Sequence, residues 1–263
     1  MPELLKRVGT AAVLIAILLA ALFLLPRAGV AALMAVIIGI AGLEWARLCR
    51  LGDLPSRFYA AGIVAAMAGL FMAGFHQPVF LAAAAFWIVA VPLWLWLGVK
   101  PEHSAALALA GFLVLVPSAL AVVALPPLDA LLVLGVAWIA DTAAYFAGRR
   151  WGRRRLAPAI SPGKTWEGAA GGLLGAAAYA MILSILLAGV QGTRMAAFLG
   201  AAALLVMVSI VGDLYESAVK RQAGAKDSGA ILPGHGGMLD RIDSAAAVLP
   251  VAALIVPCLK VAA

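Results

Sequence analysis

Apolar runs long enough to cross a bilayer recur along this sequence, and they leave room for few folds. A spanning helix needs about 20 mostly apolar residues, and nine stretches come close to or exceed that length. They are Val8–Leu25, Ala28–Leu48, Phe58–Phe75, Val79–Val99, Ala105–Leu125, Leu128–Ala147, Gly168–Val190, Met195–Leu214 and Ser244–Ala263. The sequence therefore predicts an all-α, polytopic integral membrane protein with about nine transmembrane helices.

The overall composition agrees with a membrane-embedded chain. Of the 263 residues, 65% are apolar and 12% are charged, whereas soluble domains have about 45–50% and about 25%. We expect one transmembrane enzyme domain over residues 1–263, with the part from about residue 128 carrying the active site. The two cysteines, Cys49 and Cys258, form no disulfide framework.

The positive charges are distributed unevenly between the two ends of the predicted helices. Sixteen of the 19 Lys and Arg residues lie at the N-terminus or in loops that follow even-numbered spans, and only Arg27, Arg194 and Lys260 lie on the other side. Positive loops favour the cytoplasmic side. We therefore expect a multi-pass protein of the cell (inner) membrane with a cytoplasmic N-terminus and a C-terminus on the opposite side. The net charge of +7 then reflects these loops, and no nucleic-acid partner is expected.

The segment KRQAGAKDSGAILPGHGGMLDRID, residues 220–243, is unusually polar for this chain. It lies in a predicted cytoplasmic loop between the last two spans. Pro233 and the glycines that follow exclude regular structure there, and such a turn can bring backbone N–H groups close to a phosphate. Asp240 and Asp243 are three residues apart and would share a face if they open the last helix, although acidic residues at a helix N-terminus also simply complement its dipole.

Two further carboxylates lie inside predicted spans. Asp141 is close to the end of the sixth span, where an ionised carboxylate marks a functional site by default; a pair with Arg149 or Arg150 is the alternative. Asp213 starts a set of polar residues spaced along one face of the eighth helix, which are Asp213, Glu216, Ser217 and Lys220. The simpler interpretation of that set is a solvated helix end with a Glu216–Lys220 pair.

Carboxylates and cations gathered at one membrane face indicate a metal and a phosphate. Mg²⁺ is usually held by one or two carboxylates together with substrate phosphates, and Lys and Arg bind phosphate oxygens. The combination favours phosphoryl or nucleotidyl transfer. The GKT of SPGKTWEG is no P-loop, because Pro158 occupies the required earlier glycine position and no strand is expected before it. Ser161-Pro162 either belongs to a second polar patch or simply starts a helix.

The residues quoted above resemble a known family. SAVKRQAGAKDSGAILPGHGGMLDRID, residues 217–243, resembles the signature of phosphatidate cytidylyltransferases, also called CDP-diacylglycerol synthases. SPGKTWEG is similar to the SPKKTWEG element of that family, with Gly163 where a Lys is common. The resemblance includes DTAAY at Asp141 and GDLYES at Asp213. The signature positions matched are Ser217, Lys220-Arg221, Lys226-Asp227, Pro233, His235-Gly236-Gly237, Asp240-Arg241 and Asp243.

The resemblance implies a polytopic enzyme, a homodimer, that converts CTP and phosphatidic acid to CDP-diacylglycerol and pyrophosphate. It also implies a requirement for Mg²⁺ at a centre that draws on Asp213 and Asp240. From the residues themselves we add Asp141, Asp227 and Asp243 as further metal ligands or orienting groups, and a second, monovalent cation is left open. Membrane lipid supplies one substrate.

The expected site residues fall into two overlapping sets. His235 either donates a hydrogen bond to a phosphate or has a structural role. The expected catalytic residues are Asp213, Ser217, Lys220, Arg221, Lys226, Asp227, His235, Asp240, Arg241 and Asp243. The expected substrate-binding residues are Ser161, Lys164, Thr165, Lys220, Arg221, Lys226, Gly234, Gly236, Gly237 and Arg241.

Two other classes of membrane protein fit the sequence less well. A transporter or channel would place functional charges near the midplane of the bilayer, whereas here they gather at one face. A CDP-alcohol phosphotransferase would carry a DG…AR…G…D…D pattern, which this sequence lacks.

Overall fold

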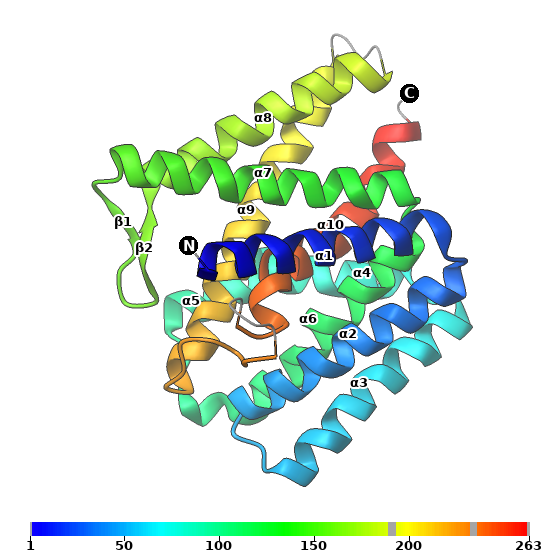
Figure 1. The fold of residues 1–263 in the computed structure, drawn as a ribbon, viewed down its shortest axis with the longest axis vertical. Helices are drawn as coiled ribbons and strands as arrows, with labels where there is room; N and C mark the ends of the chain where they lie inside the picture. The colour runs from blue at the N-terminus through cyan, green and yellow to red at the C-terminus, as the bar shows by residue number, and fades with distance from the viewer. Residues whose placement is uncertain (1, 189–192, 232–235, 262–263) are drawn as a thin grey trace.

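A computed structural model describes residues 2–188, 193–231 and 236–261 of the chain (Figure 1). These ranges contain nine long helical segments and a two-stranded hairpin, β1 (Arg155–Ala157) and β2 (Ser161–Thr165). The helices are α1 (Pro2–Leu24), α2 (Arg27–Leu48), α3 (Asp53–Ala73), α4 (Gln77–Ala85) continued through η1 (Phe86–Ala90) into α5 (Val91–Leu97), α6 (Ser104–Ala124) after the short η2 (Pro101–His103), α7 (Pro127–Trp151), α8 (Trp166–Ala188), α9 (Thr193–Gln222) and α10 (Leu239–Val261).

Eight of these helical segments are long and apolar enough to cross a membrane within the described ranges. In α1 the apolar part is shorter and covers Ala12–Leu24. The expected all-α polytopic fold is confirmed. The helix α9 continues to Gln222, so Ser217, Lys220 and Arg221 are helical.

The fourth span is interrupted by a π-helical turn. Val91 donates its N–H to the carbonyl of Phe86, five residues earlier, immediately before Pro92. Proline has no N–H to donate and disfavours the regular helical ladder, and a π-bulge is one way to absorb the defect. The helix therefore continues without a break from Gln77 to Leu97.

The hairpin corrects two expectations. A strand does precede the GKT segment, since β1 ends at Ala157, but Pro158 still occupies the glycine position that a P-loop requires. Ser161-Pro162 does not start a helix, because it lies in β2, which pairs antiparallel with β1, and α8 begins only at Trp166. The carboxylate of Glu167 accepts hydrogen bonds from the backbone N–H groups of Arg153 and Arg154. These bonds hold the start of the hairpin against the start of α8.

Small residues let α7 and α8 run side by side, with the hairpin at their shared end (Figure 1). A Cβ atom on Gly175 would lie 2.6 Å from the Cβ of Ala143, and one on Gly171 would collide with Ala147. Gly residues four apart commonly permit such close approach of membrane helices. The most buried of the spans in the described part of the chain is α6, and its residues form the centre of the apolar core.

Candidate active site

A cavity of about 1120 Å³ runs between helices from both halves of the chain. One end is polar and is lined by residues of α7, β2, α9 and α10, which include Asp141, Lys164, Asp213 and Asp243. The apolar lining residues, which we call the apolar end, come mainly from α1, α2, α6 and α7 and also from α10; they include Leu14, Leu18, Met34, Ile38, Val122, Leu134 and Leu249. The same cavity is therefore lined by both charged and apolar side chains.

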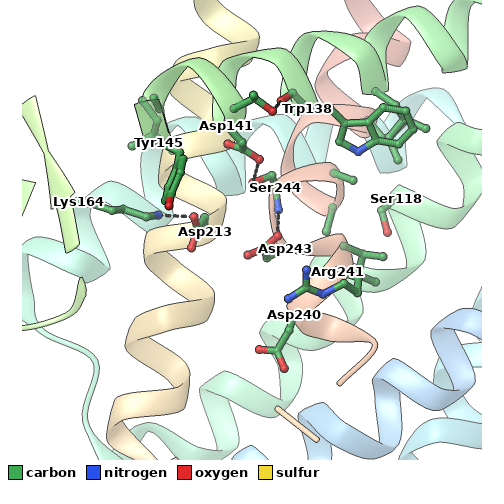
Figure 2. A pocket seen from close by; sticks show the side chains of 18 of the residues that line it. Ser118, Trp138, Asp141, Tyr145, Lys164, Asp213, Asp240, Arg241, Asp243 and Ser244 are labelled. Atoms are coloured by element: carbon green, nitrogen blue, oxygen red, sulfur yellow. Dashed lines mark hydrogen bonds and ion pairs between the residues drawn. The ribbon is translucent and has the colours of Figure 1, made fainter. Parts of the chain in front are cut away.

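Three aspartates from three helices face one another at the polar end. Asp141 extends from α7, Asp213 from α9 and Asp243 from α10 (Figure 2). All three carboxylates line the same cavity. The Ser244 hydroxyl donates a hydrogen bond to Asp141 Oδ2 at 3.4 Å, and the Ser244 N–H donates to Asp243 Oδ1 at 2.7 Å. We refer to Asp141, Asp213 and Asp243 as the aspartate cluster.

A glycine on α9 explains how α10 comes so near. A Cβ atom at Gly212 would lie 2.7 Å from the Cβ of Ala247 and 2.9 Å from the carbonyl oxygen of Asp243. Both distances are below van der Waals contact, so only glycine fits the present spacing. Gly212, which directly precedes Asp213 in the sequence, thus allows Asp243 to lie beside Asp213.

Lys164 joins the aspartate cluster from the hairpin. Its Nζ lies 2.5 Å from Asp213 Oδ2, and the Ser217 hydroxyl donates to Asp213 Oδ1 at 3.4 Å. The neighbouring Thr165 is buried, and its Oγ1 accepts a hydrogen bond from the N–H of Gly168 at the start of α8. Of the residues expected to bind substrate from this strand, Lys164 reaches the aspartate cluster, while Thr165 caps a helix.

Asp240 lies apart from the aspartate cluster and has other partners (Figure 2). Its Oδ1 accepts a hydrogen bond from Lys220 Nζ at 2.7 Å, and Lys220 also binds Glu216 at 2.7 Å. Its Oδ2 accepts from the N–H of Gly237 at 2.8 Å and from the N–H and hydroxyl of Ser228, each at 3.0 Å. Asp240 and Asp213 therefore have different partners, although both line the cavity, and their sharing of one metal remains a prediction.

The remaining expected residues occupy varied positions. Arg241 lines the cavity, whereas Lys226 and Asp227 are exposed and are not among its lining residues. Arg221 donates hydrogen bonds to the carbonyls of Ile160 and Ala225, both at 3.3 Å, and so ties α9 to the hairpin. Ser161 is partly buried in β2.

The glycines of the signature have distinct roles. Gly236 has φ +80°, a left-handed conformation that favours glycine. A Cβ atom at Gly237 would collide with the Ser228 hydroxyl and approach Glu44 to 2.7 Å. Gly234 and His235, together with Pro233, lie outside the described residues.

Sequence reasoning missed Glu44, Ser228 and Ser244. Glu44 is fully buried in α2, where its carboxylate accepts hydrogen bonds from Ser228, Met238 and Leu239. An available signal was its position, because it is a lone acidic residue within an apolar span. Ser228 and Ser244 gave no comparable signal, since serine is common in loops and at helix ends.

The donor set suits a hard divalent cation that is shared with a substrate. Among the described residues, no group of three or more His, Cys, Asp or Glu side chains is arranged to hold a metal by itself. Asp141 is exposed to the cavity, and the Asp213 side chain is 30% exposed. Mg²⁺ commonly takes only one or two carboxylates and completes its octahedron with water and phosphate oxygens. The aspartate cluster therefore fits Mg²⁺ in a site that is finished by a bound phosphate.

Fold and site together indicate an integral membrane enzyme in which charged and apolar side chains line one cavity. Residues 5–259 match the model of the cytidylyltransferase family, and the chain belongs to that family, whose members are nucleotidyltransferases.

Individual relatives agree with this assignment. The chain is 40% identical over 260 residues to the phosphatidate cytidylyltransferase of Pseudomonas aeruginosa, an alignment that covers 94% of both proteins. It is 44% identical over 135 residues to the phosphatidate cytidylyltransferase of Thermotoga maritima, or 50% of each chain. It is 47% identical over 115 residues to that of Haemophilus influenzae, or 43% of this chain and 40% of the relative.

Proposed function

We propose that this chain is a phosphatidate cytidylyltransferase that uses Mg²⁺ at the cytoplasmic face of the membrane. It would join CTP and phosphatidate to give CDP-diacylglycerol and pyrophosphate. The observation that carries the proposal is the single cavity with two chemically different ends. The charged end suits a triphosphate and a phosphate headgroup, and the apolar end suits the first part of two acyl chains.

The reaction forms one P–O bond and breaks another. A phosphate oxygen of phosphatidate attacks the α-phosphorus of CTP, and the bond from that phosphorus to the bridging oxygen of pyrophosphate breaks as pyrophosphate leaves. The attacking phosphate is already ionised near neutral pH, so no strong general base is needed. The main obstacle is the repulsion between two polyanions, which makes positioning and charge neutralisation the task of the protein.

Residues at the polar end of the cavity meet this task in different ways. One or two carboxylates of the aspartate cluster, Asp213 among them, would hold Mg²⁺, which when bound neutralises phosphate charge and stabilises the leaving pyrophosphate. The ammonium group of Lys164, which pairs with Asp213, would also bind a phosphate oxygen. Arg241, which belongs to α10, would bind phosphate as well. Lys220 is held between Glu216 and Asp240, so it would act by keeping α9 and α10 in register.

The orientation of the protein is part of the proposal. The excess of Lys and Arg at the ends of α7 and α9 and in the β1–β2 hairpin supports a cytoplasmic location for the polar end. CTP would then enter from the cytoplasm and phosphatidate from the lipid. The inner-membrane location, the cytoplasmic N-terminus and the homodimer remain predictions; reporter fusions at each terminus and the mass of the purified detergent complex would test them.

A direct assay tests the proposed reaction. Purified protein in detergent is incubated with labelled CTP, phosphatidate and Mg²⁺, and the organic phase is examined for labelled CDP-lipid. We expect product that depends on all three components and disappears on chelation with EDTA. Absence of product from folded protein would refute the proposed function, and full activity in excess EDTA would refute the metal requirement alone.

A further inference from the structure

Glu44 is a buried acidic residue whose partners all lie at the other end of the sequence. It belongs to α2 and has no exposed surface. A buried carboxylate is costly unless hydrogen bonds replace the water it has lost. Here Oε1 accepts from the N–H of Met238 at 3.0 Å, while Oε2 accepts from the N–H of Leu239 at 2.9 Å and from the Ser228 hydroxyl at 3.0 Å.

Two of these bonds satisfy the start of α10. The first N–H groups of a helix have no partner within the helix, and a negative charge there also interacts favourably with the helix dipole. Leu239 is the first residue of α10, and Met238 immediately precedes it. Glu44 therefore caps α10 from a helix that is remote in sequence.

Ser228 connects Glu44 to Asp240. Its hydroxyl oxygen lies 3.0 Å from Glu44 Oε2 and 3.0 Å from Asp240 Oδ2. A hydroxyl has one hydrogen, so it donates to one of these carboxylates at a time. Asp240 in turn holds Lys220. The connected residues are Glu44, Ser228, Asp240, Lys220 and Glu216, which link α2, α9 and α10.

Two glycines of the signature are explained by the same carboxylate. A Cβ atom on Gly229 would collide with Glu44 Oε1, and one on Gly237 would lie 2.7 Å from both oxygens of Glu44. Any larger residue at either position would push the backbone away from Glu44. The segment is therefore held near both of its ends, at 228–229 and at 237–239.

We propose that Glu44 is a positioning residue for the polar end of the cavity. This inference rests on the proposed cytidylyl transfer. Glu44 is not among the residues that line the cavity, but Arg241 and Asp243 line it and follow the capped residues by only a few positions. By fixing the start of α10, Glu44 sets where the Arg241 guanidinium and the Asp243 carboxylate meet a bound nucleotide. Most of the apolar residues that line the cavity belong to α1, α6, α7 and the part of α2 that precedes Glu44, so the contacts proposed for the acyl chains should change less.

The first test replaces Glu44 with Gln and uses Glu102→Gln as the matched control, since Glu102 is exposed in η2. Gln keeps the shape, but its NH₂ group cannot accept a hydrogen bond, so at least one of the three donors loses its partner. We expect the KM for CTP to rise about 10-fold or more, the KM for phosphatidate to change less than about twofold, and the control to match wild type. Wild-type values in folded Glu44→Gln protein, or an equal rise in both KM values, would overturn the proposal.

A second variant covers the case in which Glu44→Gln does not fold. Ser228→Ala removes the bridging hydroxyl and leaves the Met238 and Leu239 bonds to Glu44 in place. It should raise the KM for CTP in the same direction by a smaller factor, about threefold to tenfold. An unchanged KM for CTP in Ser228→Ala protein would count against Glu44 acting through this network.

Hydrogen–deuterium exchange separates this inference from the proposed reaction, because it needs no turnover. Backbone amides at 237–240 should exchange faster in Glu44→Gln than in wild type, while those of α3 should not change. If wild type makes no CDP-lipid, the proposed function fails, but the exchange comparison still decides whether Glu44 holds this segment. Equal exchange at 237–240 in both proteins would refute that role.

Discussion

Lys220 and Asp240 form an ion pair of 2.7 Å between α9 and α10, and their side chains are only 12% and 6% exposed. Asp213, about two turns before Lys220 on the same face of α9, instead pairs with Lys164 from the hairpin, and these two side chains are 30% and 24% exposed. Both aspartates line the cavity, but they have different surroundings. Asp240 is almost fully buried against Lys220, whereas Asp213 is more exposed.

This difference predicts different consequences for two matched substitutions. Asp240→Asn removes one of the two carboxylates that pair with the buried Lys220, which keeps Glu216, and losing a charged hydrogen bond of this kind costs roughly 1.5–3 kcal/mol of unfolding free energy. Asp213→Asn breaks a half-exposed pair, so its cost should stay within about 1 kcal/mol. Both variants should lose CDP-lipid formation, but only Asp240→Asn should show a marked fall in the unfolding temperature in detergent.

Thermal unfolding followed by tryptophan fluorescence, together with the labelled-CTP assay, checks both parts. Equal stability of the two variants would contradict the different burial of the Asp240 and Asp213 ion pairs. Retained turnover in Asp213→Asn would show that Asp213 is not needed to hold Mg²⁺.

The spans were predictable because each depends on about 20 neighbouring residues, a local property of the chain. The hairpin was not, because ArgLeuAla and SerProGlyLysThr show no alternation of apolar and polar residues and contain the proline and glycine typical of loops. It forms where the ends of α7 and α8 are held together, through Glu167 and the backbone of Arg153.

The candidate site was predictable in its residue types but not in its pairings. Asp141, Asp213 and Asp243 are distinctive because they lie at the ends of apolar helices. Which of them meet depends on contacts across the fold, such as the close approach of α10 to Gly212. Glu44 was missed for the same reason, since its partners are more than 180 residues away in sequence.

Gly163→Lys is expected to be tolerated and to help substrate binding. Nothing lies within 4 Å of a Cβ atom built on Gly163, which lines the cavity beside Lys164. A Lys there matches the related SPKKTWEG element and adds a positive charge where anionic substrates are proposed to bind. We expect unchanged stability and a KM for CTP or phosphatidate about twofold to fivefold lower at low salt, with the gain lost at high salt because of screening.

Initial rates at two ionic strengths measure this effect. Gly163→Ala supplies the matched control, since it fills the same open space without charge. A gain in Gly163→Ala equal to that in Gly163→Lys would contradict the electrostatic explanation.

Cys49 is expected to resist thiol reagents. It lies just after α2, and burial raises its pKa from an ordinary value of 9.0 to about 12, an effect that a side-chain hydrogen bond with Trp45 only partly offsets. The thiolate is the reactive form, and at pH 8 its fraction falls from about one in ten to about one in ten thousand. In a Cys258→Ser background, maleimide labelling at pH 8 should be at least about 1000-fold slower than in denaturant. Rapid labelling of the folded protein would contradict the burial of Cys49.

Gly171→Ala should weaken the packing of α7 against α8. The added Cβ would collide with Ala147, so the helices must separate or shift, and overpacking of this kind costs roughly 1–3 kcal/mol. Because Asp141 is on α7 and Lys164 directly precedes α8, the same shift should lower turnover. Gly69→Ala is the control, since nothing lies within 4 Å of a Cβ there, and in a helix interior alanine is favoured over glycine. We expect Gly171→Ala to have a lower unfolding temperature and a lower turnover rate of CDP-lipid formation, and Gly69→Ala to show neither decrease. A neutral Gly171→Ala would mean that the two helices are not packed as closely as Gly171 and Ala147 indicate.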